Sequence, residues 1–145
     1  SQVERNLTSP SIATLMDILQ CLGTSVSEFF SETPEEQIVF GRQDYFVKYD
    51  AELKNEIQWI IPNAQKNRME PILLTLEAGG STCPDNPHEG EEFGYVLQGS
   101  VTIHLGNRIQ RAKKGESFYF TADKNHYLSC RVGAVVIWVS SRPSF

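Results

Sequence analysis

A short polar segment next to an apolar strand contains the residues whose types could do chemistry. In NPHEGEEFGYVLQG, residues 86–99, His88 and Glu92 are accompanied by two further acids, Glu89 and Glu91. An imidazole beside carboxylates at the mouth of a strand offers the nitrogen and oxygen ligands that a divalent metal ion needs. The same residue types also make up an ordinary polar turn. The surrounding elements must distinguish these two interpretations.

Most of the chain after residue 37 has the alternating pattern of β-strands. The predicted strands cover residues 38–40, 45–49, 57–61, 71–78, 93–97, 101–105, 108–112, 117–120, 127–130 and 134–140. Turn sequences such as EAGGS, LGNR and KKGES separate them. Many short strands without a long helix between them predict an antiparallel sandwich or a closed barrel.

Length and composition indicate one folded domain, or one domain with a small appendage, because the chain has 145 residues of which 40% are hydrophobic. The cysteines, Cys21, Cys83 and Cys130, are widely spaced. Their spacing indicates neither a disulfide framework nor a zinc ribbon and favours a reducing, cytoplasmic setting. The longest apolar run, residues 134–139, is far too short to span a bilayer, and we expect a soluble protein without a signal peptide.

The net charge of −5 is unevenly distributed along the chain. Residues 1–36 carry one basic residue, Arg5, and six acidic ones, whereas the remaining residues carry 12 of each sign. This break in composition next to Pro34 predicts a linker over residues 31–36. It separates a helical segment, residues 1–30, from a β domain, residues 37–145.

The helical segment has marked ends. In TSPSIATLMDILQCLG the apolar residues recur at the spacing of one helix face, and Ser9, Pro10 and Gly23 suit its first and last turns. A second, shorter helix is predicted to begin at the capping box formed by Ser25 and Glu28.

This segment resembles the second half of a Cro/repressor-type helix-turn-helix domain. The resemblance rests on Ser1, Val3, Glu4, Arg5, Ser9, Pro10, Ser11, Leu15, Leu19, Leu22, Gly23, Ser25, Phe29 and Phe30. It implies that Ser1, Gln2 and Arg5 lie on or beside the helix that enters the major groove of DNA. The family's first two helices are absent, so we expect a fragment of a longer regulator that alone binds DNA weakly or not at all. The alternative is a helical cap that packs on the β domain.

Residues 37–145 resemble the cupin family. Its two motifs, Gly-x5-His-x-His-x3-Glu-x6-Gly and Gly-x5-Pro-x-Gly-x2-His-x3-Asn, match the chain from Gly80 and from Gly115. In the second motif, Thr121, Asp123 and Cys130 replace proline, glycine and asparagine. The resemblance implies a mainly β fold, a double-stranded β-helix or jelly-roll barrel, preceded here by a short α-helical segment.

The cupin resemblance also implies a site. His88, Glu92 and His126 match the family's metal ligands, and Asn86 stands where the first histidine would be. A neutral amide is a poorer ligand than imidazole for a transition metal. These residues are expected to hold one divalent ion, Zn, Ni, Mn or Fe, or to form a metal-free polar pocket that binds an organic ligand directly. Gly94 is expected to share their inward face and to leave room for a ligand.

Two functions remain open. The leading hypothesis is the small-molecule-sensing cupin domain of a prokaryotic helix-turn-helix transcriptional regulator, whose effector is an amine, an amino acid or a carboxylate. The alternative is a small metal-dependent cupin enzyme of the dioxygenase or isomerase type. We expect a homodimer, because pairing of edge strands removes exposed edges and two-fold symmetry suits a pseudo-palindromic operator. No membrane partner is expected.

Overall fold

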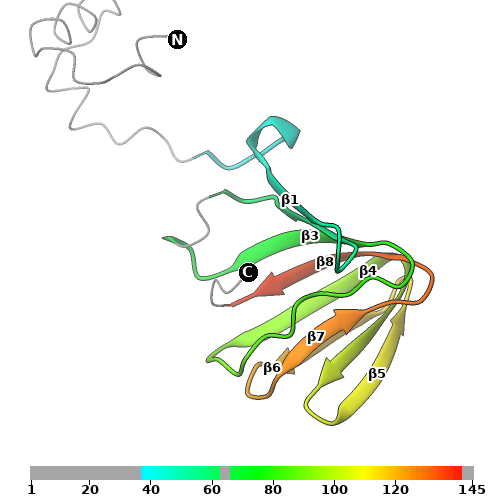
Figure 1. Cartoon of the computed structure of the whole chain (residues 1–145). Coiled ribbons are helices and arrows are strands. Elements are labelled where there is room, and N and C mark those ends of the chain that lie inside the picture. Colours follow the sequence, from blue (N-terminus) through cyan, green and yellow to red (C-terminus); the bar gives the residue numbers. More distant parts are fainter. Residues whose placement is uncertain (1–36, 63–65, 142–145) are drawn as a thin grey trace, which may run out of the picture. The chain divides into compact units, whose positions relative to one another are not determined.

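Antiparallel β-strands make up almost all regular structure in the part of the chain that the computed structural model describes, residues 37–62 and 66–141 (Figure 1). A short 3-10 helix, η1 (Arg42–Asp44), precedes them. The strands are β1 (Phe46–Asp50), β2 (Asn55–Trp59), β3 (Glu70–Leu76), β4 (Glu91–Leu105), β5 (Arg108–Lys113), β6 (Ser117–Thr121), β7 (His126–Ser129) and β8 (Ala134–Ser140). The prediction of a mainly β fold is confirmed.

One long strand, β4, belongs to both sheets of this fold. Its first half lies between β8 and β6, and its second half lies between β5 and β7. The first sheet continues from β8 through β3 and β2 to β1. Figure 1 shows β3, β8 and the start of β4 in one layer, with β5 and β7 in the other. The two sheets therefore enclose a core to which both halves of β4 contribute.

Alternation of side chains explains how the strands form that core. Along β3 and β8 every second residue is buried, and Leu74 lies opposite Val136 with both side chains fully buried. Val96 of β4 is the other neighbour of Val136. Because successive side chains of a strand point to opposite faces, the intervening residues lie on the outer face of the sheet.

Two strand predictions are wrong. Residues 38–40, predicted as a strand, have no regular structure, and η1 follows them. Residues 93–97 and 101–105 are one continuous strand instead of two. Between the two predicted strands the chain forms a β-bulge between Val96 and Gln98, followed by Gly99 with a φ of +71°. A bulge bends a strand without ending it.

The N-terminal predictions lie outside the described residues. These are the helix-turn-helix remnant over residues 1–30, the linker over 31–36, and Ser1, Gln2 and Arg5 as DNA-binding residues. They stay predictions. Among the described residues, no helix has both the length and the apolar character needed to cross a bilayer.

Candidate metal centre

Four side chains from three parts of the fold meet at the predicted site. Asp85 and His88 lie between β3 and β4, Glu92 is the second residue of β4, and His126 is the first residue of β7. One potential ligand atom from each lies within 4.8 Å of those of the other three. The structure therefore brings together the predicted residues His88, Glu92 and His126, and it adds Asp85.

Backbone hydrogen bonds hold the segment before β4 in place. The N–H of Asp85 donates to the carbonyl of His126 at 2.8 Å, and the N–H of His126 donates back at 3.1 Å. The N–H of His88 donates to the carbonyl of Ala122, also at 2.8 Å. These bonds join the segment to β7 and to the end of β6, so the geometry of the cluster is fixed by the sheet rather than by a free loop.

A single carboxylate oxygen lies at the centre of the cluster. Glu92 Oε2 is 3.0 Å from His88 Nε2 and 2.9 Å from His126 Nε2. Asp85 Oδ2 lies 3.5 Å from His126 Nε2 and 3.7 Å from His88 Nε2. Glu92 and His126 are almost completely buried, whereas His88 and Asp85 are partly exposed. One side of the cluster is consequently closed and the other reaches solvent.

The hydrogen bonds of the two imidazoles define which nitrogens face the cluster. His88 Nδ1 is 2.9 Å from the carbonyl oxygen of Glu89, and His126 Nδ1 is 2.9 Å from that of Lys124. A carbonyl oxygen only accepts, so each Nδ1 carries the proton and donates it. In a neutral ring, Nε2 then carries no proton and has a free lone pair. Both Nε2 atoms face the cluster while both Nδ1–H groups donate to backbone carbonyls, which is the arrangement of imidazoles that bind a metal ion.

Buried polar atoms in the cluster support a bound cation. His126 Nε2 and Glu92 Oε1 are buried and make no hydrogen bond in the structure. The 2.9 Å contact between His126 Nε2 and Glu92 Oε2 is close, but it brings a neutral lone pair against a negative oxygen. A divalent ion or a proton would relieve that repulsion. The donor set of two imidazoles and two carboxylates fits the predicted Zn, Ni, Mn or Fe.

The pKa of His126 reflects the same competition. Burial lowers the pKa, but the contact with Glu92, the hydrogen bond to Lys124 and the charges of Glu92 and Asp85 outweigh it. The pKa of His126 is therefore raised above the ordinary value of 6.5. In the absence of a metal ion, the site favours a proton on this imidazole.

The other two predicted site residues, Asn86 and Gly94, lie in surroundings that differ from those expected. Asn86, predicted as a weaker fourth ligand, has an exposed side chain, and the fourth side chain of the cluster comes from its neighbour Asp85. Gly94 does lie on the inward face with Glu92 and Val96, as predicted. The space beside it is filled, because a Cβ at Gly94 would be 2.0 Å from the ring of Phe118.

The comparisons with known proteins agree with this geometry. A cupin domain profile matches residues 72–140, which contain the whole cluster. Over 132 residues the chain is 30% identical to the HTH-type transcriptional regulator PuuR of Escherichia coli (strain K12), and this match covers 89% of the chain and 70% of the relative. The chain belongs to the helix-turn-helix transcriptional regulators that carry a cupin domain.

Solved structures extend the likeness. An HTH_3 family transcriptional regulator from Vibrio cholerae has 26% identity and a TM-score of 0.58, over 99% of this chain and 78% of that one. A predicted oxalate decarboxylase from Thermotoga maritima has 14% identity and a TM-score of 0.60, over 71% of this chain and 97% of that one. The second likeness is one of fold alone.

Proposed function

We propose that this protein senses a small molecule through its cupin domain and passes the signal to a helix-turn-helix segment that binds DNA in the cytoplasm. The observation that carries the proposal is the 30% identity to a transcriptional regulator over 89% of the chain. The buried cluster of His126 and Glu92 in the barrel supports it, because such a site can hold a ligand or an ion that differs between two states of the protein.

In this proposal the cluster holds one divalent ion. His88, Glu92, His126 and Asp85 would be its ligands, and the hydrogen bonds from both Nδ1 atoms to backbone carbonyls would keep the imidazoles in place. When bound, the ion would supply a Lewis-acidic contact for a polar group of the effector. The partly exposed side of the cluster, at Asp85 and His88, is where such a group would enter.

The DNA-binding part of the proposal rests on the sequence. Ser1, Gln2 and Arg5 are proposed to contact DNA, and residues 31–36 are proposed to transmit the effect of the ligand. A ligand shifts the DNA affinity only if it binds the two conformations unequally. The metal-dependent enzyme alternative uses the same cluster, but the named relative at 30% identity is a regulator and does not favour it.

The experiment that tests the proposal maps the DNA bound in the native host. The protein is tagged at its chromosomal locus and cross-linked to DNA in the cell. It is then immunoprecipitated, and the DNA that it carries is sequenced. We expect a small number of discrete, reproducible sites with pseudo-palindromic sequence. The variant Arg5→Ala is expected to lose most of this enrichment, and the matched variant Arg68→Ala, an exposed arginine of the β domain, is expected to keep it. Absence of discrete sites for the wild-type protein would contradict the proposal.

A further inference from the structure

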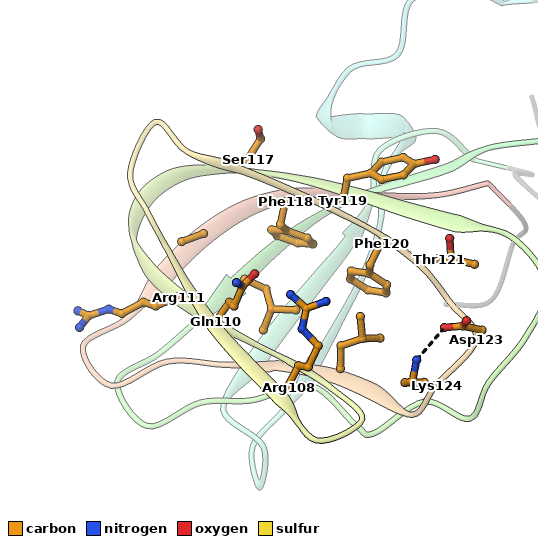
Figure 2. Close-up of a pocket in the computed structure, with 13 residues that line it drawn as sticks. Arg108, Gln110, Arg111, Ser117, Phe118, Tyr119, Phe120, Thr121, Asp123 and Lys124 are labelled. Atoms are coloured by element: carbon orange, nitrogen blue, oxygen red, sulfur yellow. Dashed lines mark ion pairs between the residues drawn. The ribbon is translucent and has the colours of Figure 1, made fainter.

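A cavity of about 460 Å³ lies between the second half of β4, β5 and β6, on the interior side of the barrel (Figure 2). Its volume is within the range that holds a small organic ligand. Its lining combines the aliphatic Ile103 and Leu105, the aromatic Phe118 and Phe120, and several charged side chains. It is therefore chemically distinct from the cluster of imidazoles and carboxylates.

The register of β4 and β5 places Arg108 on the interior face. Arg108 lies opposite Leu105, and Gln110, two residues further along β5, lies opposite the buried Ile103. Residues directly opposite in an antiparallel pair share a face, so Arg108 and Gln110 face the cavity. Figure 2 shows the Arg108 side chain reaching toward Phe118 and Phe120.

Arg111 has the opposite orientation. It lies opposite Thr102 on the other face of β5, and its guanidinium donates to Ser100 Oγ at 3.1 and 3.3 Å. Figure 2 shows it pointing away from the cavity. Within the part of the chain that the structure describes, Arg108 has no carboxylate partner. A guanidinium that is directed into a cavity and lacks a counter-ion is a ready partner for an anionic ligand.

The balance of charge in the lining favours an anion. The charged lining residues are the cations Arg108, Arg111 and Lys124 and one acid, Asp123. Because Arg111 points away and donates to Ser100, Arg108 is the cation that faces the cavity without a partner among the described residues. Asp123 already lies 3.9 Å from Lys124 Nζ. This positive lining belongs to a chain with a net charge of −5. A cationic amine would meet repulsion here, whereas a carboxylate would complete an ion pair.

The aromatic side chains define the rest of the ligand. The rings of Phe118 and Phe120 are nearly parallel, with centroids 6.1 Å apart and an interplanar angle of 11°. They present an apolar surface opposite Arg108. We propose that this cavity binds an organic carboxylate with a flat apolar body, whose carboxylate pairs with Arg108 and whose body contacts Phe118 and Phe120. This inference names the effector class and so rests on the proposed function.

Two residues that line the cavity also contact His126 of the candidate metal centre. The ring of Phe120 lies 5.2 Å from that of His126, centroid to centroid. Lys124 lines the cavity, and its backbone carbonyl accepts the hydrogen bond that His126 Nδ1–H donates. A ligand that moves either Phe120 or Lys124 would therefore act on a buried member of the cluster.

A titration with matched aromatic probes tests the ligand class. Benzoate, phenylacetate and indole-3-acetate are titrated into the isotope-labelled protein. The neutral carboxamide of each acid is titrated as its control, and benzylamine is the cationic probe. Binding is measured from the chemical shifts of the protein's backbone amides. We expect at least one carboxylate to bind with shifts at β5 and β6, and its amide at least tenfold more weakly. Arg108→Gln should weaken that carboxylate at least tenfold, whereas Arg111→Gln should leave it unchanged.

Three results would overturn the inference: binding of no carboxylate, equal binding of an amide or of benzylamine, or unchanged affinity in Arg108→Gln with a native amide spectrum. The chromatin experiment separates this failure from that of the proposed function. Discrete DNA sites together with a cavity that ignores carboxylates would refute the ligand class alone.

Discussion

At the scale of single residues, the site depends on one carboxylate that faces two imidazoles. Glu92 is inaccessible to solvent, yet its Oε1 makes no hydrogen bond. Burial of an ionised carboxylate without compensation is costly, so a positive charge beside it stabilises the arrangement. Asp85 adds a second negative charge on the more exposed side. Two carboxylates and two neutral imidazoles together match a divalent cation better than a single proton.

Replacement of Asp85 is expected to weaken metal binding. Asp85→Asn removes a charge within 3.7 Å of both imidazoles and should lower the affinity for Zn²⁺ or Ni²⁺ by roughly tenfold or more, because an amide oxygen is a poorer ligand. The neighbouring exposed variant Asn86→Ala should leave the affinity unchanged, and His126→Ala should abolish it. Competition with a fluorescent chelator measures the affinities, and inductively coupled plasma mass spectrometry measures the bound metal. A larger loss in Asn86→Ala than in Asp85→Asn would restore Asn86 as the ligand.

The sequence predicted three members of the cluster because their spacing follows the cupin motifs. It could not predict Asp85, since that side chain joins the cluster through a backbone bridge to His126, 41 residues away in the sequence. Such long-range pairing leaves no local pattern. The same limit applies to Arg108, whose orientation depends on the register of β5 against β4.

At the scale of elements, β4 positions the site because it joins the two sheets. Its first half carries Glu92, and its second half pairs with β7, which begins at His126. The transition occurs at Gly99, which has a φ of +71° and packs so closely that a Cβ would lie 2.1 Å from the carbonyl oxygen of Gly133. Both the backbone conformation and the contact require glycine.

Gly99→Ala is therefore expected to destabilise the domain strongly. The left-handed backbone costs about 1 to 2 kcal/mol for alanine, and displacement of the neighbouring backbone adds about 1 to 3 kcal/mol. Gly115→Ala is the matched control, since Gly115 has a φ of +85° and nothing within 4 Å of a Cβ, so it should lose only the first part. Urea unfolding measures both free energies. Equal losses would show that the contact with Gly133 has no energetic effect.

The alternating pattern predicted most strands to within two residues, and 134–140 matches β8 at both ends. Prediction failed where local and long-range effects compete. LQGS around Gly99 has the composition of a turn, but both halves of β4 have neighbours to pair with, so the strand continues through a bulge. Residues 38–40 are apolar, but they gain no strand partner in the described sheet.

At the scale of the molecule, the outer face of β4 and β6 provides a surface for the expected dimer. Phe93, Tyr95 and Leu97 alternate along this face of β4, each about 40% exposed. Tyr119 of β6 lies opposite Phe93 and is 61% exposed. Contiguous exposed apolar side chains on one sheet face are typical of protein interfaces. This face is a better candidate than the edge pairing expected from the sequence, because it buries large side chains.

A charge placed on this face should separate the subunits. The wild-type protein is expected to have about twice the mass of the 16.4 kDa chain in size-exclusion chromatography with light scattering at micromolar concentration. Tyr95→Lys should give the mass of one chain, because association would bury an unpaired ammonium in the centre of the contact. Ile109→Lys changes an apolar residue of β5 that is 65% exposed, and it should leave the dimer intact. A monomeric wild type would refute the dimer. A dimer that survives Tyr95→Lys would place the interface elsewhere, and pairing through the edge strand β1 would become the better explanation.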